Sequence, residues 1–231
     1  MQPEQRTTTP FVVAVDGPSG SGKSSTARGV AHRLGLHYLD TGAMYRAVTW
    51  WMLQHDVPVG DPAAVAAHCH KPVLTSGTDP SAPTIEVDGT DVGVQIRTAE
   101  VTEAVSPVSA VPEVRRRLVD LQREVVRESG PGIVVEGRDI GTVVCPDAAL
   151  KIYLTADPAA RAARRHAELT GTPASVAETQ AALARRDKID SGRAAAPLLQ
   201  ADDAVALDTT ELTLDEAIEA IVDLAEAQRG A

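Results

Sequence analysis

The stretch Gly17-Pro18-Ser19-Gly20-Ser21-Gly22-Lys23-Ser24 decides the fold of this chain. It fits the pattern G-x-x-x-x-G-K-[ST], with a β-branched run before it at 11–15 that predicts a buried strand and a stretch after it at 24–34 that predicts a helix. In such a unit, backbone N–H groups of the loop and the positive end of the helix point at a phosphate. Lys23 is expected to reach the β- and γ-phosphates of a nucleotide, and the Ser24 hydroxyl to bind Mg²⁺. The flanking elements favour this phosphate-binding loop over a chance glycine-rich turn.

The composition predicts one globular protein without a nucleic-acid or membrane partner. The chain has 231 residues, of which 43% are hydrophobic and 3% aromatic, so its core is expected to consist mainly of Ala, Val, Leu and Ile. A net charge of −10 argues against nucleic acid or an anionic membrane surface as the main partner. Cys69 and Cys145 offer no disulfide framework, which favours the cytoplasm. Residues 1–10 are expected to be a flexible N-terminus, without a signal peptide, and no apolar run reaches the length of a membrane span.

Strand and helix patterns alternate along the chain, which predicts an α/β domain with a doubly wound parallel sheet. Further core strands are expected at 37–40, 132–136, 150–154 and 204–207. Helices are expected at 43–54, 111–128 and 213–229, with further helical segments within 157–193. The short runs at 72–76, 84–88 and 92–96 have strand character and are separated by turn residues, so they predict a small β insert.

Two polar segments follow predicted core strands: Asp40-Thr41-Gly42-Ala43-Met44-Tyr45-Arg46 and Glu136-Gly137-Arg138-Asp139-Ile140-Gly141. Loops at the carboxyl ends of parallel strands form the ligand crevice of an open α/β sheet. The hydroxyl, phenol and guanidinium groups of the first segment suit a phosphate with a sugar or base. In the second segment, the arginine can neutralise a phosphate while the neighbouring aspartate accepts a hydrogen bond from a donor group of the ligand. A capped helix start and a surface turn with a local ion pair remain the alternatives.

A basic region lies in the second half of this acidic chain, formed by Arg161, Arg164 and Arg165 and by the segment Arg185–Arg193. Beside a phosphate-binding loop, such a region predicts a lid that closes over phosphates. An exposed helix face with i,i+4 ion pairs would account for some of these residues instead.

These motifs together resemble the bacterial cytidylate kinases, a branch of the nucleoside monophosphate kinases. The resemblance is carried by the segments 16–24, 39–46, 136–142 and 186–193 and continues through 196–198 and 207–210, so it spans about residues 11–228. Thr41 stands where serine is also common in that family, and Glu136 where aspartate is. The resemblance implies a single P-loop kinase domain with a core (about 11–41, 110–155 and 194–228), a monophosphate-binding lobe that includes the insert (about 42–109) and a lid (about 157–193).

The resemblance also implies an enzyme that moves the γ-phosphoryl of ATP to CMP or dCMP with Mg²⁺ bound at Ser24, and we expect it to be a monomer. The implied catalytic residues are Lys23, Arg138, Arg186 and Arg193. The implied ATP site comprises Gly17, Pro18, Ser19, Gly20, Ser21, Gly22, Lys23, Ser24, Ser25, Arg161 and Arg165. The implied CMP site comprises Thr41, Tyr45, Arg46, Ser106, Arg115, Arg138, Asp139, Arg186, Asp190 and Arg193.

Two other kinds of protein fit this sequence less well. A UMP- or shikimate-type kinase would share the phosphate-binding loop, but the segments 40–46 and 137–139 argue against it. A nucleotide-switch binding module that signals to a partner would carry an N-K-x-D guanine motif, and this sequence has none.

Overall fold

The computed structural model describes residues 10–168, 175–193 and 196–230. The predicted flexible N-terminus lies outside the described residues, except for Pro10. Within these ranges, no helix combines the length and the apolar character needed to cross a bilayer.

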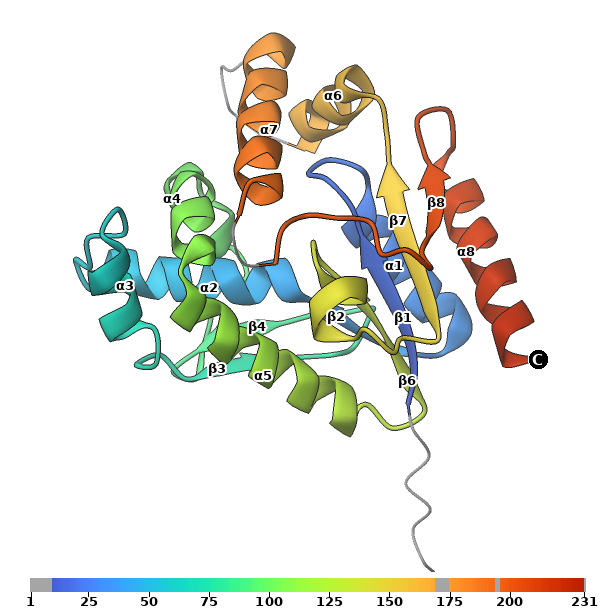
Figure 1. Ribbon diagram of the computed structural model, residues 1–231, viewed down its shortest axis with the longest axis horizontal. Coiled ribbons are helices and arrows are strands. Elements are labelled where there is room, and N and C mark those ends of the chain that lie inside the picture. Colours follow the sequence, from blue (N-terminus) through green and yellow to red (C-terminus); the bar gives the residue numbers. More distant parts are fainter. Residues whose placement is uncertain (1–9, 169–174, 194–195, 231) are drawn as a thin grey trace, which may run out of the picture.

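The centre of the molecule is a sheet of five parallel strands (Figure 1). In spatial order these are β2 (His37–Asp40), β6 (Gly132–Glu136), β1 (Phe11–Asp16), β7 (Leu150–Thr155) and β8 (Val205–Asp208). The predicted α/β fold with a parallel sheet is therefore confirmed. The carboxyl ends of β1, β2 and β6 lie at one edge, because all three strands run the same way.

Helices cover both faces of the sheet, and the alternation of side chains along β1 shows how. Val13 and Val15 pack on the side of α1 (Lys23–Leu34) and α8 (Leu214–Arg229). Val12 and Ala14 belong to the core on the other side. That second core contains side chains from α2 (Thr41–Gln54), α4 (Ala99–Ala110) and α5 (Pro112–Glu128). Because both faces are buried, β1 reads as a continuous apolar run rather than an alternating one.

The predicted β insert is present as a second, antiparallel sheet of β3 (Leu74–Ser76), β4 (Ile85–Val87) and β5 (Thr90–Asp91), after the short helix α3 (Pro62–His68). The strand predicted at 92–96 is wrong, since the chain forms a 3₁₀ turn there, η1 (Gln95–Arg97). Val92 and Ile96 are buried and Val94 is 83% exposed. The Ile96 N–H donates to the Val92 carbonyl at 3.0 Å, so the apolar residues recur at helical spacing.

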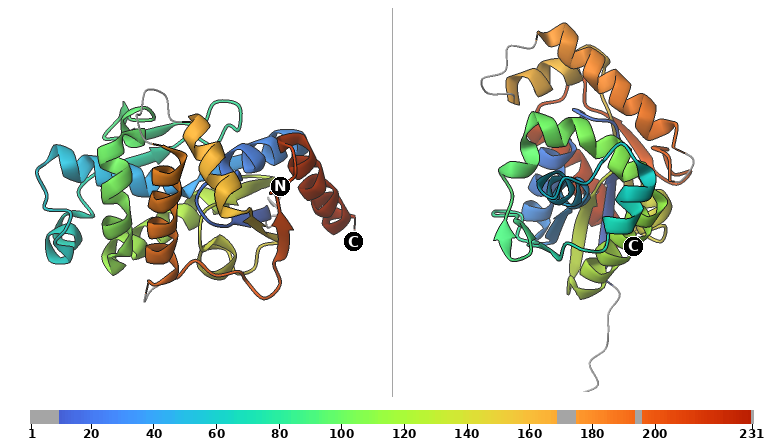
Figure 2. Two further views of the ribbon diagram at one scale, coloured as in Figure 1. Left: turned by 90° about the horizontal axis from the view of Figure 1, so that it is seen from above. Right: turned by 90° about the vertical axis from the view of Figure 1, so that its left-hand side faces the viewer.

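Two helices of the predicted lid, α6 (Pro158–Glu168) and α7 (Val176–Ser191), pack on each other above the carboxyl ends of β1 and β7 (Figure 1). Residues 169–174 of that segment lie outside the described residues. Seen from above, α7 lies beside α4 (Figure 2). A short π-helical segment, η2 (Ile140–Val144), follows β6 and lies next to the end of β1.

Candidate active site

The loop between β1 and α1 has the backbone geometry of a phosphate site. Gly17 has φ +148°, and a Cβ there would lie 2.1 Å from the Leu154 carbonyl oxygen, so only glycine fits against β7. Gly22 has φ 86° and precedes α1, whose first turn contains no acidic residue. Within the described residues, no side chain caps the start of α1. Its first N–H groups are therefore available to an anion.

Lys23 and Glu136 are two buried ionisable side chains beside this loop, and each influences the pKa of the other. The Lys23 ammonium donates to the Pro18 carbonyl at 2.7 Å. Burial lowers the pKa of Lys23 to about 7, with Arg138 lowering it further and Glu136 opposing. Burial likewise raises the pKa of Glu136 to about 7, the charge of Asp40 adds to this, and Lys23 opposes it. Desolvation dominates both shifts, so a phosphate entering here would meet a lysine already stripped of water.

Arginines gather in the same pocket without enough carboxylates to balance them. Burial lowers the pKa of Arg186 to about 9, and the charges of Arg138 and Arg46 lower it further. Burial lowers the pKa of Arg46 to about 10, with Arg165 the next cause. The Arg186 Nε is buried without a hydrogen-bond partner among the described residues. Neighbouring positive charges that lower the pKa values of Arg46 and Arg186 form a site that an anion would stabilise.

A polar, buried group lies at the other end of the pocket. Arg115 forms an ion pair with Asp139, and both side chains are less than a tenth exposed. The Arg115 guanidinium lies over the Tyr45 ring, 5.5 Å from its centroid, and donates to the Ser109 carbonyl at 3.2 Å. Ser106 is buried beside them in the pocket wall. The group offers carboxylate, hydroxyl and guanidinium functions to one planar ligand.

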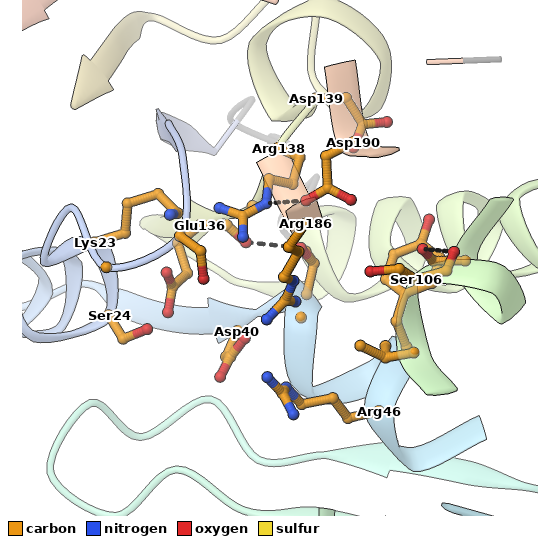
Figure 3. A pocket seen from close by; sticks show the side chains of 18 of the residues that line it. Lys23, Ser24, Asp40, Arg46, Ser106, Glu136, Arg138, Asp139, Arg186 and Asp190 are labelled. Atoms are coloured by element: carbon orange, nitrogen blue, oxygen red, sulfur yellow. Dashed lines mark hydrogen bonds and ion pairs between the residues drawn. The ribbon is translucent and has the colours of Figure 1, made fainter. Parts of the chain in front are cut away.

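Asp190 connects this end to the arginines. Its carboxylate accepts from the Arg138 Nε at 3.0 Å and pairs with the Arg193 Nη2 at 2.6 Å. Figure 3 shows Arg138 and Arg186 between Lys23 on one side and Ser106 on the other. The pocket therefore has a phosphate-binding loop, a cationic middle and a polar end.

The structure brings most of the predicted site residues into this one pocket. Those that line it are Ser19, Gly20, Gly22, Lys23, Ser24, Ser25, Thr41, Tyr45, Arg46, Ser106, Arg115, Arg138, Asp139, Arg165, Arg186, Asp190 and Arg193. Gly17, Pro18, Ser21 and Arg161 do not line it.

Two of the predicted ligands, Arg161 and Thr41, make hydrogen bonds that hold parts of the chain together. Arg161 donates to the Ser19 carbonyl at 3.0 Å and forms an ion pair with Asp187. The Thr41 hydroxyl donates to the Glu136 carbonyl at 2.7 Å. Arg161 therefore connects α6 to the loop before α1, and Thr41 fixes the end of β6.

Asp40, Arg97, Ser109 and Glu136 also line the pocket and were not assigned from the sequence. Asp40 accepts from the Ala43 N–H at 2.9 Å as the cap of α2. Glu136 offered a usable signal, because a carboxylate that ends a fully buried strand needs a charged or hydrogen-bonding partner. Arg97 offered none, since it follows the predicted strand at 92–96 and is the last residue of the turn η1.

The oxygen donors near the loop fit a hard cation held mainly by phosphates. Ser24 is exposed at the start of α1, and Glu136 lies near enough for the Ser24 hydroxyl to oppose the rise that burial causes in the Glu136 pKa. Within the described ranges, no group of three or more His, Cys, Asp or Glu side chains could hold a metal ion by itself. Mg²⁺ is commonly held by one or two protein oxygens, substrate phosphates and water. Ser24, backed by Glu136, meets that requirement.

Comparison with known proteins gives one consistent result. A family model described as Cytidylate kinase matches residues 13–227. A cytidylate kinase of Streptomyces avermitilis is 60% identical over 226 residues, covering 98% of this chain and 97% of that protein. Cytidylate kinases of Streptomyces griseus and Nocardia farcinica are 60% and 55% identical, covering 94% and 91% of this chain and the same shares of their own lengths.

Proposed function

The chain belongs to the cytidylate kinase family, and from this premise we propose that its pocket holds CMP facing ATP and passes the γ-phosphoryl directly between them. ATP-dependent phosphorylation of CMP, giving CDP and ADP, is the activity of this nucleoside monophosphate kinase. We include dCMP, which would give dCDP, as a second acceptor.

The cationic middle of the pocket is the observation that carries the proposal. Phosphoryl transfer needs in-line positioning and positive charge around the moving group more than it needs covalent help from the protein. Between the phosphate-binding loop and the polar end, burial lowers the pKa values of Arg46 and Arg186, and the charge of Arg138 lowers both further. We assign them to the acceptor phosphate and the migrating phosphoryl. Binding of these anions would relieve the repulsion among the guanidinium groups.

We place the ATP phosphates on the loop before α1, with Lys23 beside the migrating group. When bound, Mg²⁺ would neutralise phosphate charge, and Ser24 is the residue that would hold it. Glu136 lies near the Ser24 hydroxyl, which opposes the rise that burial causes in the Glu136 pKa, and we assign the carboxylate to orienting that hydroxyl. Because Lys23 is buried, its ammonium interacts with phosphate oxygens in a medium of low dielectric constant.

We place the cytosine against Asp139, Arg115 and Ser106. The exocyclic amine at C4 can donate to the Asp139 carboxylate, and Arg115 can donate to the unprotonated ring nitrogen or carbonyl. Uracil would present a carbonyl to that carboxylate. An acceptor buried against another acceptor costs roughly 1–3 kcal/mol, so we expect CMP to be preferred over UMP by about 10–100-fold. Asp190, close to Arg138 and Arg193, is assigned to the sugar hydroxyls.

The larger-scale assignments are part of the same proposal. Residues 42–109 would act as the monophosphate-binding lobe and 157–193 as the lid, both closing on the core when substrates bind. The monomeric state and the cytoplasmic location expected from Cys69 and Cys145 stay predictions.

A screen of acceptors tests the function. Purified protein is incubated with ATP, Mg²⁺ and one of CMP, dCMP, UMP or shikimate, and ADP formation is followed. We expect ADP to form fastest with CMP and dCMP. ADP formation that prefers UMP or shikimate would support the other kinases, and hydrolysis independent of any acceptor would support the nucleotide-switch module.

A further inference from the structure

Asp16, the last residue of β1, is bound to a segment far away in the sequence. Its Oδ1 accepts from the Ile140 N–H and its Oδ2 from the Gly141 N–H, both at 2.8 Å. The side chain is buried, and the residue stands directly before the phosphate-binding loop. Asp16 therefore satisfies the first two N–H groups of η2, groups that have no partner within the helix itself.

The residue in the local position to cap η2 does not do so. Asp139 directly precedes η2, and aspartate is among the best residues for capping a helix start. Its side chain makes no capping hydrogen bond and pairs with Arg115 in the pocket instead. Since Asp16 already occupies the Ile140 and Gly141 N–H groups, the Asp139 carboxylate is left to face the ligand.

Two more contacts fix the same segment to the end of β1. The Gly137 N–H donates to the Val15 carbonyl at 3.0 Å, and the Arg138 guanidinium donates to the Gly17 carbonyl. The segment 137–141 is thus attached to three consecutive residues of β1 and its loop. A change at Asp16 would release the part of this segment that follows Asp139.

We propose that Asp16 is a positioning residue for acceptor specificity, which caps η2 from β1 and so keeps the Asp139 carboxylate available for the nucleobase. The proposal rests on the assignment of Asp139 to the base in the proposed function. If Asp16 had a purely structural role, its substitution would lower kcat/KM equally for every acceptor. If Asp16 acts through Asp139, the decrease in kcat/KM depends on the base of the acceptor.

The test variant is Asp16→Asn, which keeps the size of the side chain. Its amide oxygen can accept one N–H, but its NH₂ group would oppose the other N–H as donor against donor. The Asp139 carboxylate would then turn back to cap η2. We expect the ratio of kcat/KM for CMP to that for UMP to fall by about tenfold, the effect of one lost buried hydrogen bond. The KM for CMP should rise, while the KM for ATP stays within about twofold, as for loss of acceptor binding alone.

A matched control separates specificity from stability. The control variant is Thr213→Ala. The Thr213 hydroxyl caps α8 by accepting from the Glu216 N–H. No residue of α8 lines the pocket. The substitution should lower the melting temperature without changing the ratio. The ratio does not depend on the fraction of folded enzyme, because both kcat/KM values come from one preparation. If Asp16→Asn does not fold, Asp16→Ser, which retains a single acceptor, is used with the same expectation.

A double-mutant cycle decides whether Asp16 acts through Asp139. Asp139→Ala should itself reduce the ratio, and Asp16→Asn should then have no further effect on it. The base assignment stands if Asp139→Ala reduces the ratio. The proposal is then overturned if Asp16→Asn leaves the ratio unchanged, or if it reduces the ratio equally in the wild-type and Asp139→Ala enzymes. If Asp139→Ala leaves the ratio unchanged, the base assignment and the proposal both fall.

Discussion

At the scale of single residues, Lys23 gives the sharpest prediction. It lies buried beside the loop that is assigned to the phosphates, so it is a pre-organised donor for developing charge. Lys23→Ala should reduce kcat by on the order of 10²-fold or more, as removal of such a donor does. The exposed Lys71, changed to alanine, is the matched control and should retain activity. Near-normal turnover in a folded Lys23→Ala enzyme, judged by circular dichroism, would exclude this lysine from the mechanism.

Arg186 is expected to destabilise the free protein while it binds the acceptor. Burial and the charges of Arg138 and Arg46 lower its pKa to about 9. A base whose pKa is lowered on folding costs stability at every pH below the folded pKa, and the cost shrinks only above about pH 9. At neutral pH, Arg186→Met should therefore raise the melting temperature of the free protein, by about 2–4 °C per kcal/mol relieved. The same change should weaken CMP binding by about tenfold or more, because charge-assisted hydrogen bonds to phosphate are lost.

Arg185 supplies the control for that experiment. It is the neighbour of Arg186 on α7, is exposed and does not line the pocket. Arg185→Met should change neither the melting temperature nor CMP affinity by a comparable amount. A lower melting temperature for Arg186→Met would contradict the view that the arginines repel one another in the free enzyme.

The residues of the site were predicted from the sequence where a motif carried them. Strand ends and the glycine-rich loop indicate which side chains meet, because parallel strands end at one edge. Partners made by tertiary packing could not be predicted in this way. Asp16 caps η2 across more than a hundred residues, and Arg161 hydrogen bonds to the Ser19 carbonyl without lining the pocket itself.

At the scale of helices and strands, α6 and α7 are expected to move. Arg186 and Asp190 of α7 line the pocket, so displacement of this helix opens or closes it. Water must be excluded during transfer, or ATP would be hydrolysed. We expect crystals with CMP and a non-hydrolysable ATP analogue to show α6, α7 and the 42–109 lobe shifted toward the core, relative to crystals without ligands. Superimposable positions in the two crystal forms would reject closure.

The core strands could be predicted from the sequence because their apolar residues are typical of a buried strand. The buried strands β1 and β6 contain continuous aliphatic runs, and β7 has Leu150, Ile152 and Leu154 at alternate positions. The insert was harder to predict, since Val92, Val94 and Ile96 alternate as in a strand. Val92 and Ile96 are buried whereas Val94 is exposed, which favoured a helical turn. The helix α4, which contains Pro107, was not predicted from the sequence.

At the scale of the whole molecule, activity should require a divalent cation that the protein does not hold by its own side chains. Among the described residues, no cluster of His, Cys, Asp or Glu could hold a metal ion, and Ser24 near Glu136 is the assigned ligand, so we expect the cation to arrive with ATP. Treatment with EDTA should abolish ADP formation and addition of Mg²⁺ should restore it, while the melting temperature of the free protein stays unchanged. A melting temperature that falls with EDTA would indicate a resident structural metal instead.

The most direct test of direct transfer follows the phosphoryl group itself. ATP labelled in its γ-phosphoryl is incubated with CMP, Mg²⁺ and the purified protein, and the products are separated. The label should appear in the β-phosphoryl of CDP, in an amount equal to the ADP formed. Label that appears in inorganic phosphate whether or not CMP is present would contradict the assignment of this pocket to CMP phosphorylation.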